Sequence, residues 1–166
     1  EFCASLDQLN QADLNIVSVA DDGIENVVSQ LNKNIPVVHT SGSVNLAVFQ
    51  GFNRAGILYP LQTFTHGYQP ENQDFPFLVE ASNQEFEHDL IEFCRVHLSQ
   101  DAVIVDSQKR AKIHLAAVLV NNFTNHLAFE GERILSEVDE DLTLLKPLMH
   151  EGITKLFNTN SFDAQT

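Results

Sequence analysis

The sequence predicts an α/β protein, in which a parallel β-sheet in the first half is followed by a mostly helical C-terminal domain. Segments typical of strands alternate with segments typical of helices over the first half, which indicates parallel strands joined by helices. The last third shows helical periodicity with few breakers. The 166 residues, 43% of them hydrophobic, suffice for a packed core in one domain or in two small ones.

Three apolar segments rich in β-branched or aromatic residues are the predicted strands of the first half: residues 14–20, 35–40 and 56–64. Between them, apolar residues recur at helical spacing, which predicts helices over residues 24–31 and 43–52. The ends of parallel strands in such sheets face the crevice where ligands bind. The residues that follow each strand are therefore the first candidates for a site.

The second half starts after a polar, turn-rich connector. Residues 75–80 and 102–106 are further predicted strands, separated by an amphipathic helix over residues 83–98. Residues 109–138 keep helical periodicity without a proline, which predicts one helix of about 45 Å at a rise of ~1.5 Å per residue. A last helix is predicted over residues 140–158.

Pro147 is expected to kink or split this last helix, because proline cannot donate a backbone hydrogen bond in a helix interior. The change of character along the chain predicts a sheet-containing domain over residues 1–82 and a helical domain over residues 83–166. The chain has no initiator methionine, and we expect it to be a fragment of a longer protein in which the helical domain continues.

The composition restricts the class of partner. A net charge of -14 and a pI of about 4.6 argue against nucleic acid and against anionic membrane surfaces, which both attract basic proteins. No apolar run reaches the ~20 residues of a membrane span. Cys3 and Cys94 show no CxxC spacing, so we expect reduced thiols in a cytoplasmic protein. Neither HExxH nor paired CxxC motifs occur, so no metal site is predicted.

The second predicted strand ends in His39, which is followed by Thr40, Ser41, Gly42 and Ser43. A serine hydrolase would need a GxSxG elbow, and this spacing does not provide one. Two interpretations remain. The segment is either a ligand cradle, in which glycine allows close approach and small hydroxyls offer hydrogen bonds, or an ordinary polar turn with a satisfied histidine.

Polar residues also follow the first and third predicted strands. Ala20 and Asp21 belong either to a loop beneath a bound nucleotide or to a plain helix cap, where acidic residues are favoured. Pro60, Gln62 and Thr63 form either the lip of a crevice or the end of an edge strand.

The predicted long helix has a polar line. Arg110 and His114 are four residues apart and share one face, and Asn121 and Asn122 continue the line. A polar stripe inside a core helix is costly unless it is satisfied. The line therefore faces either a substrate or a hydrogen-bonded seam between the helices of a dimer.

Together these motifs define a resemblance. The succession SVADDGI, VVHTSGSV, GILYPLQTF, FPFLVEA and KRAKIHLAAVLVNNFTNHL resembles a bacterial family of Rossmann-like proteins with an added helical domain, the DUF2520 group. It is similar more distantly to the pyrroline-5-carboxylate reductase and 6-phosphogluconate dehydrogenase-like enzymes. The resemblance implies NAD or NADP as cofactor, a small-molecule substrate and a homodimer formed through the helical domain. The glycine-rich turn of the family would precede Glu1, so this chain alone is expected to bind a dinucleotide weakly or not at all.

In the distant relatives a lysine on the long helix donates the proton, with an asparagine beside it. The resemblance places Lys112 or His114 in this role, with Asn121 or Asn122 as partner. A histidine titrates near neutral pH, which suits proton transfer. The remaining positions implied by the resemblance are, for the cofactor, Ala20, Asp21, His39, Thr40, Ser41 and Gly42, and, for the substrate, Ser43, Pro60, Gln62, Thr63 and Arg110.

Three hypotheses about function follow. The first is a fragment of an NAD(P)-dependent oxidoreductase that moves a hydride between nicotinamide and a small carbonyl or imine. The second is a non-catalytic sensor of a nucleotide or metabolite on the same fold. The third is a module that serves only dimerisation. A Rossmann-like half does not by itself choose between them.

Overall fold

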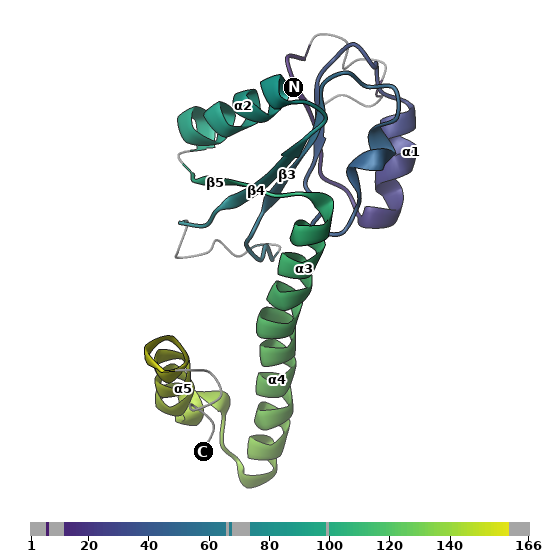
Figure 1. The fold of residues 1–166 in the computed structure, drawn as a ribbon. Helices are drawn as coiled ribbons and strands as arrows, with labels where there is room; N and C mark the ends of the chain where they lie inside the picture. Colours follow the sequence, from purple (N-terminus) through teal and green to yellow (C-terminus); the bar gives the residue numbers. More distant parts are fainter. Residues whose placement is uncertain (1–5, 7–11, 66, 68–73, 99, 160–166) are drawn as a thin grey trace. The chain divides into compact units, whose positions relative to one another are not determined.

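The computed structural model describes residues 6, 12–65, 67, 74–98 and 100–159. These residues contain one five-stranded sheet in the order β1-β2-β3-β4-β5, shown in Figure 1. Its strands are β1 (Asn15–Val17), β2 (Val37–His39), β3 (Ala55–Pro60), β4 (Phe77–Ala81) and β5 (Ala102–Ile104). Each lies inside or within one residue of a strand that the sequence predicts.

The parallel sheet predicted for the first half of the chain is confirmed, and the complete sheet is mixed. β1, β2 and β3 run parallel, β3 and β4 run antiparallel, and β4 and β5 run parallel again. The described residues of the connection between β3 and β4 contain no helix. A parallel neighbour needs a long crossover that is usually helical, whereas a direct return gives an antiparallel pair.

The helices cover the two faces of the sheet. Figure 1 shows α1 (Ile24–Ser29) and α2 (Gln84–Phe93) on opposite sides of it. One apolar cluster joins α1 to β1, β2 and β3, and its buried members are Val17, Ile24, Val28, Leu31, Val37, Phe49, Phe52 and Ala55. The other joins α2 to the central strands, with Val38, Leu58, Val79, Phe86, Leu90 and Cys94 buried. The predicted helices over residues 24–31 and 83–98 are confirmed.

The helix predicted over residues 43–52 is wrong in type, because only the short 3-10 helix Leu46–Phe49 forms there. The Ser41 hydroxyl accepts hydrogen bonds from the backbone N–H groups of Ser43 and Val44, so the chain makes a side-chain-closed turn first. Gly51 ends the segment soon afterwards with a φ of 84°, a conformation in which glycine is unstrained.

The predicted long helix is confirmed as α3 (Ser107–Val118), a π-helical segment (Leu119–Phe123) and α4 (Thr124–Leu135), extended by a 3-10 turn (Ser136–Val138). The last predicted helix is split into a 3-10 helix (Leu142–Leu145) and α5 (Lys146–Asn158). Pro147 lies in the first turn of α5, where its missing N–H leaves no hydrogen bond unmade, so it starts a helix instead of kinking one.

The structure divides into two compact units, Glu1–Ala116 and Ala117–Thr166. This division differs from the boundary expected after residue 82. β5 pairs with β4, and α2 packs on the sheet through Phe86 and Leu90, so both elements belong to the first unit. The helical domain proper begins within the long helix.

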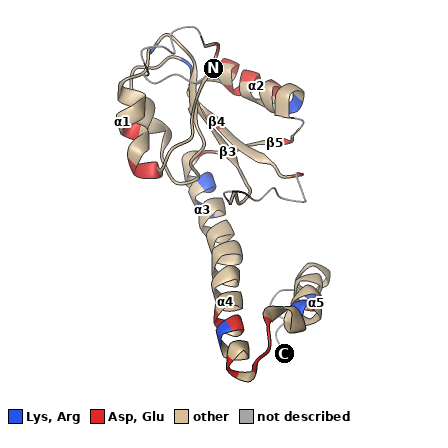
Figure 2. Ribbon diagram, turned by 180° about the vertical axis from the view of Figure 1, so that it is seen from behind, with Lys and Arg blue, Asp and Glu red and all other residues tan. Residues whose placement is uncertain are grey.

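The surface is acidic. Figure 2 marks acidic residues in red on both α1 and α2. No helix in the described ranges is long and apolar enough to cross a membrane. The same ranges hold no group of three or more His, Cys, Asp or Glu side chains arranged to bind a metal ion.

Candidate functional site at the carboxyl edge of the parallel strands

The loops after β1 and β2 meet where these parallel strands end. The Ser43 hydroxyl donates a hydrogen bond to Oδ2 of Asp21, and Thr40 Oγ1 donates to Ser18 Oγ over 3.3 Å. Both contacts join residues 22 positions apart in the chain. The structure thus brings together two of the three polar segments that the sequence indicates.

Helix α3 adds a histidine to this edge. Ser107, Arg110 and His114 follow one another at helical spacing and all make contacts with the sheet or its loops. Ser107 Oγ and Arg110 Nη1 both donate to the carboxylate of Glu80 at the end of β4. One turn further, Nδ1 of His114 lies 3.0 Å from the Tyr59 hydroxyl of β3. The two rings meet edge to face, with centroids 5.5 Å apart.

Gly42 packs against both rings of this pair. It is buried, and a Cβ atom built on it would lie 2.8 Å from Cγ of His114 and 2.8 Å from Cζ of Tyr59. Cβ atoms essentially never come within 3.0 Å of such neighbours. Only glycine therefore allows this loop to touch both rings, and a role of Gly42 in cofactor binding stays a prediction.

The hydroxyl of Ser41 holds the loop in shape. Its oxygen accepts hydrogen bonds from the backbone N–H groups of Ser43 and Val44, each over 3.1 Å, and lies 3.4 Å from the Ser43 hydroxyl. The Ser41 N–H in turn donates to Nδ1 of His39 over 3.2 Å. Ser41 is thus a turn-forming residue, and its oxygen is occupied by the backbone.

His39 is completely buried and stacks on Phe49, with ring centroids 5.3 Å apart. Burial, and then the positive charge of Arg110, lower its pKa from 6.5 to about 4, against a smaller opposing effect of Asp21. The ring is therefore neutral at pH 7. Since Nδ1 accepts from Ser41, the proton of the neutral ring sits on Nε2, a buried atom without a hydrogen-bond partner among the described residues.

This histidine is expected to make folding sensitive to acid. The folded pKa, about 4, lies below the unfolded value of 6.5, so the unfolded chain binds the proton first as the pH falls. The free energy of unfolding should be unaffected above pH 6.5 and should drop by on the order of 3 kcal/mol towards pH 4. Urea unfolding measured between pH 7.5 and pH 4.5 tests this, and His39→Gln should flatten the curve. An equally steep curve for the variant would refute the assignment to His39.

Two further groups in the cluster have shifted pKa values. Burial alone would raise the pKa of Asp21, but hydrogen bonds from Ser43 and Ser41, and the nearby His114 and His39, lower it overall. Burial raises the pKa of Tyr59. At neutral pH the site therefore contains an aspartate anion and a protonated tyrosine, whose hydroxyl shares a hydrogen bond with Nδ1 of His114.

Other candidates lie outside this cluster. Lys112 is exposed on α3 and makes no contact with the cluster in the described structure, so His114 is the candidate proton donor that the fold brings to the sheet. Asn121 and Asn122 belong to the second unit, where Nδ2 of the first donates to Oδ1 of the second over 3.0 Å. Their role as catalytic partners stays a prediction.

The remaining candidates close strands or turns. The Ala20 carbonyl accepts the N–H of Gly23 over 2.8 Å, as in a plain helix start. Pro60 is the last residue of β3 and pairs with Phe77, and Oε1 of Gln62 accepts the Thr63 N–H over 2.8 Å. Contacts of Pro60, Gln62 and Thr63 with a substrate stay predictions.

Arg110, which was expected to face the substrate, has a side chain that is only 1% exposed. Nη1 donates to Glu80 and Nη2 donates to the carbonyl of Val44 over 2.6 Å. An arginine on the buried face of the helix had to be neutralised by the protein, because an unpaired charge is not tolerated there.

Sequence reasoning missed Tyr59 and Glu80. Both lie in strands that were correctly predicted, and each is a polar residue near the end of an apolar segment. The strand register explains why both lie near the site. Ile57 of β3 pairs with His39 of β2 on one side and with Glu80 of β4 on the other. Tyr59 follows two residues after Ile57, on the same face of the sheet.

The fold and the site define a class. The arrangement is Rossmann-like with an added helical unit. The parallel strands end in polar loops that are joined by hydrogen bonds, and a long helix places a histidine beside them. The family model described as "Domain of unknown function (DUF2520)" matches residues 75–166, more than half of the chain. The chain therefore belongs to the DUF2520 family, as its sequence motifs indicate.

Solved structures agree with this placement. The chain is similar to a protein from Bacteroides fragilis named "putative NADP oxidoreductase BF3122", with a TM-score of 0.86 and 29% identity over 100% of this chain and 66% of that one. Protein TM1727 from Thermotoga maritima has the same fold, with a TM-score of 0.71 and 22% identity over 91% of this chain and 61% of that one. The chain thus spans less than two thirds of either protein's length. No curated protein matches the sequence.

Proposed function

We propose that this chain forms the substrate side of the active site of an NAD(P)-dependent oxidoreductase. The observation behind the proposal is the Tyr59–His114 pair, held on Gly42 at the carboxyl edge of the parallel strands. Ligands of open α/β sheets bind at this edge. The name of the similar Bacteroides fragilis protein points to the same kind of chemistry. The substrate would be a small carbonyl or imine.

The polar residues at the strand ends fit part of a dinucleotide. The hydroxyls of Thr40 and Ser18 and the carboxylate of Asp21 could bind the ribose and the nicotinamide amide by hydrogen bonds. A pyrophosphate needs a glycine-rich turn at a helix start, and none of the seven glycines of the chain has the GxGxxG spacing. We therefore expect weak or no dinucleotide binding by this chain alone.

His114 is the proposed proton donor. When bound, the nicotinamide would supply or accept a hydride. In this proposal the Tyr59 hydroxyl donates its hydrogen bond to Nδ1, which leaves the ring proton of His114 on Nε2. From there it can hydrogen-bond the oxygen or nitrogen of the substrate and transfer a proton as charge develops. Asp21 is an anion in the same cluster, and the nearby His114 contributes to the lowered pKa of its carboxyl.

Turnover of the full-length protein tests the proposal, with NADH or NADPH oxidation followed against a panel of small carbonyls and imines. His114→Ala should lower kcat about 100-fold, because a positioned general acid contributes at least that much. Tyr59→Phe should have a smaller effect in the same direction. Lys112→Ala should leave kcat unchanged, since Lys112 lies outside the cluster.

The reverse pattern, with Lys112→Ala inactive and His114→Ala active, would move the proton donor to Lys112. Cofactor binding without any turnover would favour the non-catalytic sensor. Absence of NAD(P) binding by the full-length protein would end the oxidoreductase proposal.

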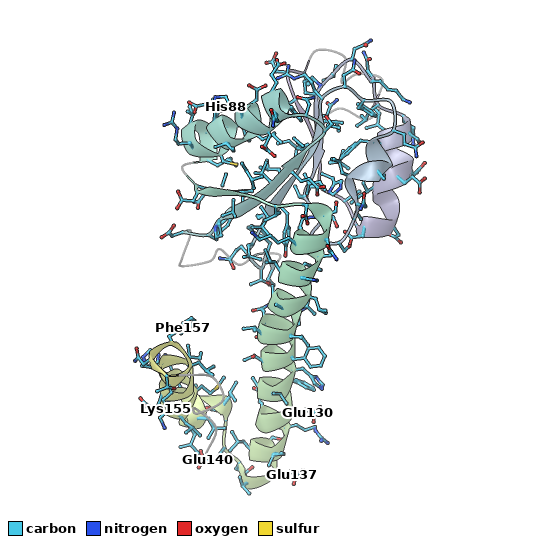
Figure 3. All side chains as sticks on the ribbon, in the orientation of Figure 1. His88, Glu130, Glu137, Glu140, Lys155 and Phe157 are labelled. Carbon is cyan, nitrogen blue, oxygen red and sulfur yellow. The ribbon has the colours of Figure 1, made fainter. Side chains whose placement is uncertain are left out.

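A second proposal, formation of a homodimer through the helical unit, rests on exposed apolar surface. No described residue from 117 to 159 is buried. Val120, Leu127 and Ile134 are exposed and recur every seven residues, so they form one stripe along the helix. Phe157, seen on α5 in Figure 3, is 86% exposed. A second copy of the chain would cover such apolar surface, which isolated monomers rarely expose.

Light scattering on the eluting protein checks the dimer. We expect about twice the monomer mass of 18.6 kDa. Leu127→Asp, in the centre of the stripe, should give monomers, because a charge would be buried in the interface. The matched control is His126→Asp, which introduces the same residue at an exposed neighbouring position outside the stripe. A monomeric wild-type protein, or a dimer unaffected by Leu127→Asp, would contradict this interface.

A further inference from the structure

Arg110 contacts both the sheet and the candidate site. Its guanidinium donates through Nη1 to Glu80 on β4 and through Nη2 to the Val44 carbonyl, over 2.6 Å in the second case. The Ser107 hydroxyl lies 2.8 Å from both oxygens of the Glu80 carboxylate. The arginine is 1% exposed, so nothing outside the protein can reach it. Its charge is matched inside the fold by Glu80, and Nη2 is directed at a loop, whereas Nε has no hydrogen-bond partner among the described residues.

That loop is the one on which His114 packs. Val44 closes the turn made by the Ser41 hydroxyl, and Gly42 lies within that turn. His114, four residues after Arg110 on α3, packs on Gly42. Helix α3 therefore holds the same short loop at two points, one turn apart. A movement of the loop at the Arg110–Val44 contact would therefore also alter the His114–Gly42 contact.

An ion pair alone does not explain the choice of residue. A lysine could neutralise Glu80 as a single point charge. Arginine has a planar fork of five N–H donors, which lets one side chain bond a carboxylate and a carbonyl in fixed directions. A lysine that paired with Glu80 would not also make the hydrogen bond to the Val44 carbonyl. This second hydrogen bond is the one on the side of the candidate site.

We propose that Arg110 is a positioning residue, which sets the loop 41–44 against α3 so that His114 meets Tyr59. The consequence for turnover rests on the proposed function, but the positioning itself does not. Glu80 and Ser107 keep the guanidinium in place. A chain of contacts thus connects the end of β4 to Arg110, Arg110 to Val44 in the loop, and the loop to His114 through Gly42.

Nuclear Overhauser effects between the His114 ring and both Gly42 and the Tyr59 ring measure the positioning directly in the full chain, without cofactor. The main variant is the double change Arg110→Met with Glu80→Gln, which removes both charges and leaves no buried ion unpaired. We expect it to fold and to lose these contacts, together with the ring-current shift of the Gly42 protons. Arg110→Lys, which keeps the charge pair, should also lose them.

A folded double variant with wild-type contacts and a wild-type Gly42 shift would overturn the proposal. If the double variant does not fold, Arg110→Lys decides by the same criterion. In the full-length protein, both variants should lower kcat at least ~10-fold while KM changes less, as expected when a proton donor is misplaced. Lost contacts in a protein without NAD(P)-dependent turnover would uphold the positioning and reject the proposed function.

Discussion

Glu80→Gln is expected to lower the free energy of unfolding by about 3–5 kcal/mol, because it leaves the buried charge of Arg110 without its counter-ion. The arginine side chain is 1% exposed and that of Glu80 is 16% exposed, so water cannot replace the lost partner. Breaking one half of a buried pair is far more costly than the net contribution of the pair. Urea unfolding followed by circular dichroism at pH 7 measures the difference.

The chain offers a matched control in one of its exposed arginine–carboxylate pairs. Arg54 and Asp89 are 46% and 44% exposed, and solvent screens them, so Asp89→Asn should change the free energy of unfolding by only about 0–1 kcal/mol. Removing both buried charges at once, with Arg110→Met in the Glu80→Gln background, should recover much of the loss. Equal effects of Glu80→Gln and Asp89→Asn would show that burial of the first pair does not matter.

Gly42→Ala should destabilise the fold by about 1–3 kcal/mol and separate His114 from Tyr59. The added methyl group would lie 2.8 Å from ring atoms of both residues, and neither ring is the flexible end of a long chain. Relief therefore requires a movement of the loop or of α3. Thermal unfolding measures the first effect, and the nuclear Overhauser effects between the two rings measure the second.

Gly23→Ala is the control in the same unit. A Cβ on Gly23 would make only an ordinary contact of 3.5 Å with Val19, and its φ of -90° suits any residue. This change should leave stability within about 0.5 kcal/mol, or raise it slightly through the unfolded chain. A melting temperature of Gly42→Ala equal to that of Gly23→Ala would mean that the loop can yield without cost.

Much of the fold follows from local sequence. The strands and the long helix were predictable because apolar periodicity depends on residues close together in the chain. The antiparallel β3–β4 pair was not, since the direction of a strand depends on the path of its connection. The helix expected over residues 43–52 failed because the Ser41 hydroxyl competes for the backbone N–H groups, a local effect that average propensity does not include.

The candidate site was predictable only in part. The polar ends of β1 and β2 could be expected to meet, because parallel strands end at one edge, and the Asp21–Ser43 contact agrees with this. The partners of the α3 residues could not be expected. Tyr59 lies 55 positions before His114, and Glu80 lies 30 positions before Arg110.

The sequence by itself determined which residues are apolar and where all five strands and most of the helices form. Only the tertiary structure decided that Arg110 faces the protein interior and that His114, and not Lys112, meets the sheet. The reason is geometric. Spacing along a helix defines which residues share a face, but the packing of that helix on a distant strand decides which face is buried.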